Sequence, residues 1–389
     1  MCEPASEFEL AQPDDWHHHL RDGAALATTV PAAARQFQRA IIMPNLVPPV
    51  TTTEMAQDYK KRILEALHAS GAPAGSFDPM MTIYLTDTTP PEEIKRAAES
   101  GDVRAFKLYP AGATTNSASG VTDLAKVTAT LQAMALHGMP LCVHGEVTDA
   151  DTDVFDRERV FFKTKASALL SNPTPNPAPN PNPNPNPKPN PNPNPNLNQA
   201  PALLESAPGL RVIFEHITTK EGAQFVLEAG PNVAGTVTPQ HMLVNRNAML
   251  VGGIRPHMYC LPILKTEEDR KALLEAVRVC DRIFIGTDSA PHAIGNKENS
   301  CGCAGCYSAH AALELYAEAF EKAGMLQRLE AFCSTNGPAF YGVAPNTTRV
   351  TLKREEWTVP DSLPFGDTVV VPFRAGTKLQ WRLQDRLAA

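Results

Sequence analysis

The sequence predicts a (β/α)8 barrel of the TIM type, and three observations support this fold class. Eight short apolar runs recur along the chain, and each ends close to a polar residue capable of chemistry. Helix-compatible stretches separate the runs, an alternation that is typical of a parallel sheet. The polar residues stand at the carboxyl ends of the expected strands, where active sites of this fold gather. A doubly wound sheet is the alternative, but no glycine-rich phosphate fingerprint follows the first strand.

The first expected strand carries three histidines, and the later ones are apolar runs that stop abruptly. The two-residue period of a strand places His17 and His19 on one side and His18 on the other. The seven later strands are expected at 40–44 before Asn45, 81–85 before Asp87, 104–106 before Lys107, 140–143 before His144, 211–215 before His216, 233–238 before His241 and 282–287 before Asp288. The expected helices are Thr53–Ala69, Pro91–Ser100, Val121–His137, Lys220–Ala229 and Thr266–Arg278.

Residues 172–198 are nearly pure Asn-Pro repeat. Proline at every second position removes backbone donors and disfavours the helical region at each preceding Asn. We expect an exposed, disordered insertion within one barrel domain that spans residues 1–389. A tolerated surface-loop insertion is favoured over a partner-binding tract, because long loops add little closure entropy.

Composition narrows the class of protein and its partners. The chain has 389 residues, of which 43% are hydrophobic and 20% charged, as in ordinary soluble enzymes. A net charge of −7 argues against nucleic acid as a partner. No apolar run approaches the roughly 18 residues of a membrane span, and the acidic N-terminal segment resembles no targeting peptide. We therefore expect an intracellular protein, cytoplasmic by default, with mitochondrion or plastid as alternatives if a transit peptide was removed.

Six strand-end residues are candidate metal ligands. Taken alone, each is more often a structural or solvated residue, but one barrel rim would bring all six together. Four imidazoles and one carboxylate suit two divalent ions of the zinc type. Arg21 adds a fixed cation suited to a substrate carboxylate. The six candidates are His17, His19, Lys107, His144, His216 and Asp288.

Long blocks of this chain resemble the dihydroorotases of the amidohydrolase superfamily, in their shorter bacterial-type class. The resemblance implies a zinc-dependent enzyme of pyrimidine synthesis that interconverts N-carbamoyl-L-aspartate and L-dihydroorotate through a bridging hydroxide. It also implies a homodimer. The matching blocks are Gln12-Pro-Asp-Asp-Trp-His-His-His-Leu-Arg-Asp-Gly23, Met43-Pro-Asn-Leu-Val-Pro-Pro-Val-Thr-Thr52, Lys107-Leu-Tyr-Pro-Ala111, Val143-His-Gly-Glu-Val-Thr148, Phe214-Glu-His-Ile-Thr-Thr219, Thr238-Pro-Gln-His241, Gly286-Thr-Asp-Ser-Ala-Pro-His292 and Ser300-Cys-Gly-Cys-Ala-Gly-Cys306.

Roles for single residues follow from the resemblance. It implies that His17, His19 and Asp288 hold one zinc ion, that His144 and His216 hold the other, and that carboxylated Lys107 bridges them. Asp288 would also be the general acid and base. Residues 109–120 would form a lid that closes on substrate. The implied substrate contacts are Arg21, Asn45, Thr114, Thr115, Met242, His292 and Ala304.

Other readings of these features stay open at this stage. A related cyclic amidase, such as an allantoinase or hydantoinase, would share the metal centre, and a non-catalytic scaffold would share the barrel. The cysteines at 301–306 suggest a separate zinc or redox site, but their spacing is too tight for an ordinary structural zinc site. We therefore expect this segment to border the pocket. His18, His241 and His257 are expected to be structural.

Overall fold

The computed structural model describes residues 6–166 and 207–384, and in this part of the chain eight parallel strands form one sheet in sequence order. The sheet closes on itself where its last and first strands end. The amide of Asp288 donates to the His17 carbonyl at 2.9 Å, and the amide of His19 donates to the Ser289 carbonyl at 3.2 Å. The predicted TIM-type barrel is confirmed.

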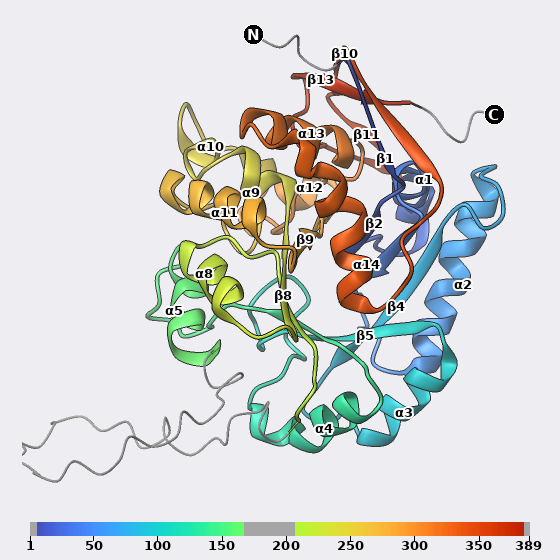
Figure 1. Ribbon diagram of the computed structural model, residues 1–389, viewed down its shortest axis with the longest axis vertical. Coiled ribbons are helices and arrows are strands. Elements are labelled where there is room, and N and C mark those ends of the chain that lie inside the picture. The colour runs from blue at the N-terminus through green and yellow to red at the C-terminus, as the bar shows by residue number, and fades with distance from the viewer. Residues whose placement is uncertain (1–5, 167–206, 385–389) are drawn as a thin grey trace, which may run out of the picture.

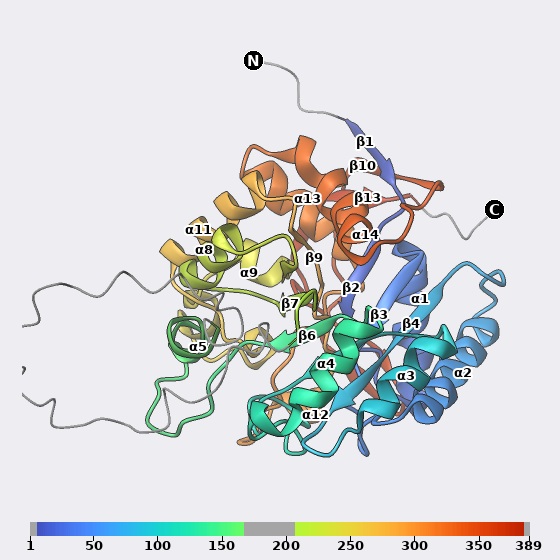
Figure 2. The ribbon, with the colours of Figure 1, turned by 60° about the horizontal axis from the view of Figure 1, so that its bottom comes forward.

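All eight expected barrel strands are present, and helices surround them in Figures 1 and 2. The strands are β2 Asp14–His18, β3 Arg39–Ile42, β4 Asp78–Leu85, β5 Val103–Leu108, β6 Leu141–His144, β7 Val212–Glu215, β8 Val233–Val237 and β9 Ile283–Ile285. The helices are α1 Leu26–Gln36, α2 Thr53–Ala69, α3 Pro91–Ser100, α4 Thr128–Leu136, α5 Arg157–Phe161, α8 Lys220–Glu228, α9 Pro239–Leu243, α10 Asn247–Leu250, α11 Glu267–Val279, α12 Ile294–Lys297, α13 Ala312–Lys322 and α14 Asn336–Tyr341.

One expected helix is shorter than predicted. The helix expected over 121–137 begins only at Thr128, after a 3-10 turn over Leu124–Val127. Val121 cannot join it, because its amide donates to the Tyr109 carbonyl at 2.9 Å and so belongs to the preceding loop. Elsewhere local signals set the helix ends, as where the Thr52 side chain accepts from the Met55 amide at the start of α2.

The barrel core explains why the strands read as unbroken apolar runs. Every residue of β6, β7, β8 and β9 is buried, as expected for a parallel sheet covered by helices. On β2, Trp16 points away from the candidate ligands and stacks on Tyr341 of α14 at 4.2 Å between ring centroids. A Cβ at Gly337 would lie 1.9 Å from Trp16 Nε1, so only glycine permits this approach.

A second, antiparallel sheet joins the first and last strands of the described chain. Its order is β1-β10-β13, with β1 Glu7–Ala11, β10 Arg349–Thr358 and β13 Lys378–Leu383. A hairpin of β11 Leu363–Phe365 and β12 Thr368–Val370 lies between β10 and β13 in sequence. These five strands were not predicted from the sequence. Their partly exposed residues lack the uniform apolar character that marks the barrel strands.

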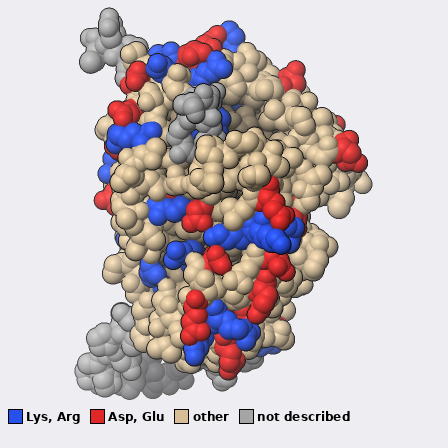
Figure 3. Space-filling model, turned by 90° about the vertical axis from the view of Figure 1, so that its right-hand side faces the viewer, with Lys and Arg blue, Asp and Glu red and all other residues tan. Residues whose placement is uncertain are grey.

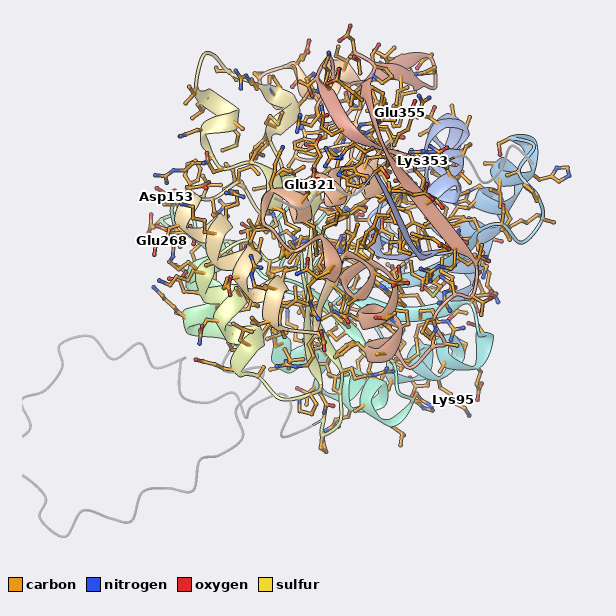
Figure 4. All side chains as sticks on the ribbon, turned by 45° about the horizontal axis from the view of Figure 1, so that its top comes forward. Lys95, Asp153, Glu268, Glu321, Lys353 and Glu355 are labelled. Carbon is orange, nitrogen blue, oxygen red and sulfur yellow. The ribbon has the colours of Figure 1, made fainter. Side chains whose placement is uncertain are left out.

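Charged side chains lie mainly on the outside of the molecule. Figure 3 shows Lys and Arg side by side with Asp and Glu on one face, and in Figure 4 Lys95, Asp153 and Glu268 lie at the periphery. Among the described residues, no helix is both long and apolar enough to cross a membrane. The predicted Asn-Pro insertion at 172–198 lies outside the described residues, and the assignment of 1–389 to one domain stays a prediction.

Candidate metal and substrate site

His17, His19 and Asp288 form a buried group at the closing edge of the barrel. Asp288 Oδ1 lies 3.5 Å from His17 Nε2 and 3.1 Å from His19 Nε2. One potential ligand atom from each residue lies within 4.8 Å of the others, close enough to hold one ion. Burial lowers the pKa of both histidines well below its usual value, so both rings are neutral and free to ligate.

Glu215 orients His17 by contacting the ring nitrogen that faces away from Asp288. Its Oε2 lies 2.8 Å from His17 Nδ1 and accepts a hydrogen bond from Thr236 Oγ1 at 2.6 Å. The carboxylate therefore holds the proton on Nδ1 and leaves Nε2 as the free electron pair facing Asp288. This role of Glu215 was not predicted from the sequence. A charged residue that ends a buried strand beside His216 was the signal that could have revealed it.

His144, His216 and Lys107 continue the group across the barrel. Ring centroids are 4.8 Å apart for His144 and His216 and 5.0 Å apart for His216 and His17. Glu146 Oε2 lies 2.7 Å from His144 Nε2, a second carboxylate and histidine pair. Lys107 Nζ is buried, has no hydrogen-bond partner and lies 5.1 Å from the centre of the Tyr109 ring. Burial lowers the Lys107 pKa, which favours a neutral amine.

The backbone is strained at three of the predicted site residues. Arg21, His216 and Asp288 have φ angles of 62°, 41° and 42°, a region that side-chain-bearing residues rarely occupy. Such strain persists where the surrounding fold imposes it, and it clusters at functional sites. Burial also raises the pKa of Asp288 to about 7, although the nearby Lys107 charge acts in the opposite direction. A carboxyl group with this pKa can both take and give a proton near neutral pH.

A cationic corner lies beside the metal group. Arg21 donates from Nε to the Pro291 carbonyl at 2.9 Å, and its Nη2 lies 2.9 Å from His292 Nε2. His292 Nε2 also lies 3.0 Å from the Ala304 carbonyl. Burial lowers the His292 pKa to about 2, so Arg21 carries the positive charge of this corner. A guanidinium held in this way suits a planar carboxylate.

One small cavity joins the metal group, the cationic corner and the loop over residues 109–120. Ten of the thirteen predicted site residues line it, and Lys107 lies buried next to its Tyr109 wall. His292 borders it through Arg21 and Ala304. Met242 is not among its lining residues, because it lies in α9 within the apolar core. The lining residues are His17, His19, Arg21, Asn45, Tyr109, Thr114, Thr115, His144, His216, Leu261, Asp288, Ala290, Ala304 and Gly305.

Four lining residues were not predicted as substrate contacts. Tyr109 follows Lys107 by two residues, just past the end of β5 and inside the predicted lid, so the period of a strand could have revealed it. Ala290 and Gly305 lie inside the matching blocks 286–292 and 300–306. Leu261 comes from a loop far from any strand end, and its apolar type carries no functional signal in the sequence.

His18, His241 and His257, which were expected to be structural, each have a bonding partner outside the cavity. His18 is buried on the opposite side of β2, with its Nδ1 2.6 Å from Asp15 Oδ2. His241 Nε2 lies 2.9 Å from the Pro262 carbonyl, and His257 pairs with Glu298 at 2.9 Å. No cysteine of the described residues forms a disulfide. The segment 301–306 supplies Ala304 and Gly305 to the cavity, as expected for a pocket border.

Comparisons with known proteins agree with this geometry. Residues 15–355 match the amidohydrolase family. A dihydroorotase of Laribacter hongkongensis is 57% identical over 375 residues, which cover 96% of this chain and 98% of the relative. The crystal structure of a Campylobacter jejuni dihydroorotase superposes with a TM-score of 0.80 at 31% identity and covers 99% of each chain. A Saccharomyces cerevisiae dihydroorotase in complex with 5-fluoroorotic acid gives 0.81 at 28% identity, covering 99% of this chain and 100% of that one.

Proposed function

Since this chain belongs to the amidohydrolase family and, within it, to the dihydroorotases, we propose that it interconverts N-carbamoyl-L-aspartate and L-dihydroorotate in pyrimidine synthesis. The observation that carries this proposal is the shared cavity. Its walls bring together the neutral His17 and His19 rings, the Asp288 carboxyl group and the Arg21 guanidinium. A cyclic amide that bears a carboxylate needs both features, one for the amide and one for the anion.

The residues present fit two zinc ions. His17, His19 and Asp288 would hold one ion, and His144 and His216 would hold the other. Lys107 has a buried nitrogen without a described partner, and as a neutral amine it would add carbon dioxide and release one proton, giving a carbamate whose two oxygens would help to hold the ions. When bound, such ions supply a water of lowered pKa and polarise the amide carbonyl.

Asp288 would move the proton of the reaction. In hydrolysis it accepts a proton from the attacking water and delivers it to the departing amide nitrogen, and cyclisation reverses both transfers. Its pKa of about 7 supports both roles near neutral pH. The closure bond between its amide and the His17 carbonyl holds the strand end that carries this carboxyl group.

Arg21, Asn45 and His292 would bind the substrate carboxylate, and Thr114 and Thr115 would cover it. Arg21 is positioned by its hydrogen bond to the Pro291 carbonyl. Asn45 contacts the lid, because its Nδ2 donates to the Thr115 carbonyl at 3.2 Å. Replacing both threonines with alanine should lower turnover far more than it loosens zinc. Unchanged turnover of this double variant would remove the lid from the proposal.

A steady-state assay with dihydroorotate, hydantoin and allantoin tests the proposed function. We expect a preference for dihydroorotate, about two zinc ions per chain, and loss of turnover in Lys107→Ala. A preference for hydantoin or allantoin would favour another cyclic amidase, and a folded zinc-loaded protein without activity on any of the three would favour a scaffold. Size-exclusion chromatography with light scattering tests the expected homodimer.

A further inference from the structure

The loop over residues 109–120 is anchored firmly at its base. The Val121 amide donates to the Tyr109 carbonyl at 2.9 Å, and the Ala111 amide donates to the Val121 carbonyl at 3.2 Å. Next to it, Thr122 donates from its amide and its hydroxyl to the Asp87 carboxylate, at 2.8 and 2.5 Å. These bonds hold the two ends of the loop together and would persist if its tip moved.

The tip of this loop, residues 113–118, is held to the rest of the protein by fewer and longer hydrogen bonds than the base. Within the described parts of the chain, residues 113–118 make three hydrogen bonds to side chains or backbone outside the loop. Asn45 Nδ2 donates to the Thr115 carbonyl at 3.2 Å, and Asn116 Nδ2 donates to the Asn45 carbonyl at 3.1 Å. The Tyr84 hydroxyl donates to the Asn116 carbonyl at 3.5 Å. Two of the three bonds use Asn116, and its side chain supplies one of them.

We propose that Asn116 is a positioning residue that latches the lid onto Asn45 in the loop after β3, and so holds Thr114 and Thr115 over the cavity. This inference rests on the proposed function of the cavity. Asn116 itself does not line the cavity, so it acts through its neighbours. Its latch joins the lid to Asn45, whose side chain does line the cavity. Lid closure and the placement of the Asn45 amide are therefore coupled through one pair of reciprocal bonds.

The backbone of Asn116 suits this role. Its φ of 57° lies in the left-handed region, where asparagine is one of the few side-chain-bearing residues that are well tolerated. The side chain is exposed, so it is not needed to fill the core. A closed lid held by three bonds of 3.1 Å or longer can reopen easily, as product release requires.

The test is Asn116→Asp in the full-length zinc enzyme. Aspartate keeps the shape and tolerates the same backbone, but it puts a carboxylate oxygen against the Asn45 carbonyl in place of a donor. The matched control is Ser119→Ala, an exposed position of the same loop. Measurements are kcat and KM for dihydroorotate, hydrogen exchange of residues 111–120, zinc content and melting temperature.

We expect Asn116→Asp to lower kcat/KM by about tenfold, the value of one lost hydrogen bond at the upper end of its range. We also expect faster exchange at residues 113–117, with unchanged zinc content and melting temperature. Ser119→Ala should match the wild type in every readout. Tyr84→Phe removes a second tip bond and should shift both readouts in the same direction.

If Asn116→Asp gives the same kcat/KM and the same hydrogen-exchange rates as Ser119→Ala, the proposed latch is overturned. A wild-type enzyme without dihydroorotate turnover would contradict the proposed function instead, and the exchange data alone would then decide the latch. If Asn116→Asp lowers the melting temperature, Tyr84→Phe provides the decision. If Tyr84→Phe has the same hydrogen-exchange rates and kcat/KM as the wild type, the latch is rejected.

Discussion

Replacing Lys107 with methionine should abolish turnover and yet leave the metal-free protein at least as stable as the wild type. Lys107 is fully buried, and no described group accepts a hydrogen bond from its Nζ. A buried polar group without a hydrogen-bond partner costs about 1–3 kcal/mol, and methionine has a similar size without that polar group. We therefore expect Lys107→Met to raise the free energy of unfolding of the metal-free protein.

Lys297 provides the matched control, because it is also a buried lysine but a fully bonded one. Its Nζ donates to the carbonyls of Tyr259, Cys303 and Gly305 at 2.8, 2.7 and 2.8 Å. Lys297→Met leaves the Cys303 and Gly305 carbonyls without their donor, whereas the Tyr259 carbonyl still accepts from the Gly305 amide at 3.0 Å. At about 1 kcal/mol or more for each unsatisfied group, it should destabilise the protein by roughly 2 kcal/mol.

The assay has two arms. Urea unfolding of the metal-free proteins gives the three free energies of unfolding, and zinc content with dihydroorotate turnover is measured after reconstitution. We expect Lys107→Met to be stable, short of zinc and inactive. A loss of stability in Lys107→Met as large as in Lys297→Met would show that Lys107 is a structural residue. Retained turnover would refute its place between the metals.

Three further outcomes are expected. Glu215→Gln should weaken zinc binding by about 10–100-fold in chelator competition, because a carboxylate partner fixes and strengthens a ligating histidine; unchanged affinity would contradict this role. Arg21→Ala should cost about 2–5 kcal/mol in kcat/KM for dihydroorotate, and a smaller loss would mean that the carboxylate lies elsewhere. Burial lowers the His241 pKa to about 3, so the unfolded chain takes up this proton first and stability falls as pH drops below about 6.5, by about 1.4 kcal/mol per unit. His241→Asn should reduce that slope in urea unfolding at pH 7 and pH 5, and an unchanged slope would refute the assignment.

Much of the fold could be predicted because its signals are local. The bounds of α2 and α3 agree with the expected Thr53–Ala69 and Pro91–Ser100, where a capping threonine and an initial proline mark the starts. The barrel strands were visible because a doubly covered parallel sheet demands unbroken apolar runs. The antiparallel sheet of β1, β10 and β13 was not visible, since its β1–β10 pairing joins residues more than 300 positions apart and its strands lack unbroken apolar runs.

The candidate site also divides into residues that could be predicted from the sequence and residues that could not. Its chemistry-bearing residues could be identified because imidazole, carboxylate and guanidinium groups rarely end apolar runs by chance. Leu261 and Glu215 were missed because one is a loop leucine without a distinctive pattern and the other orients a ligand instead of facing the cavity. Met242, which was predicted as a substrate contact, packs in the apolar core and does not line the cavity, so its role stays a prediction.

The sequence by itself determined the barrel, the order of its strands and the six strand-end groups suited to two metals. Periodicity and residue type are properties of short segments, so they can be read without knowing what lies beside them. Only the tertiary structure decided which groups face one another. Two of the contacts found join segments distant in the chain: Glu215 with His17, and Asn116 with Asn45. The absence of a described partner for the buried Lys107 nitrogen likewise depends on what the other strands place around it. Such contacts depend on the closure of the barrel and the path of its loops, which no single segment encodes.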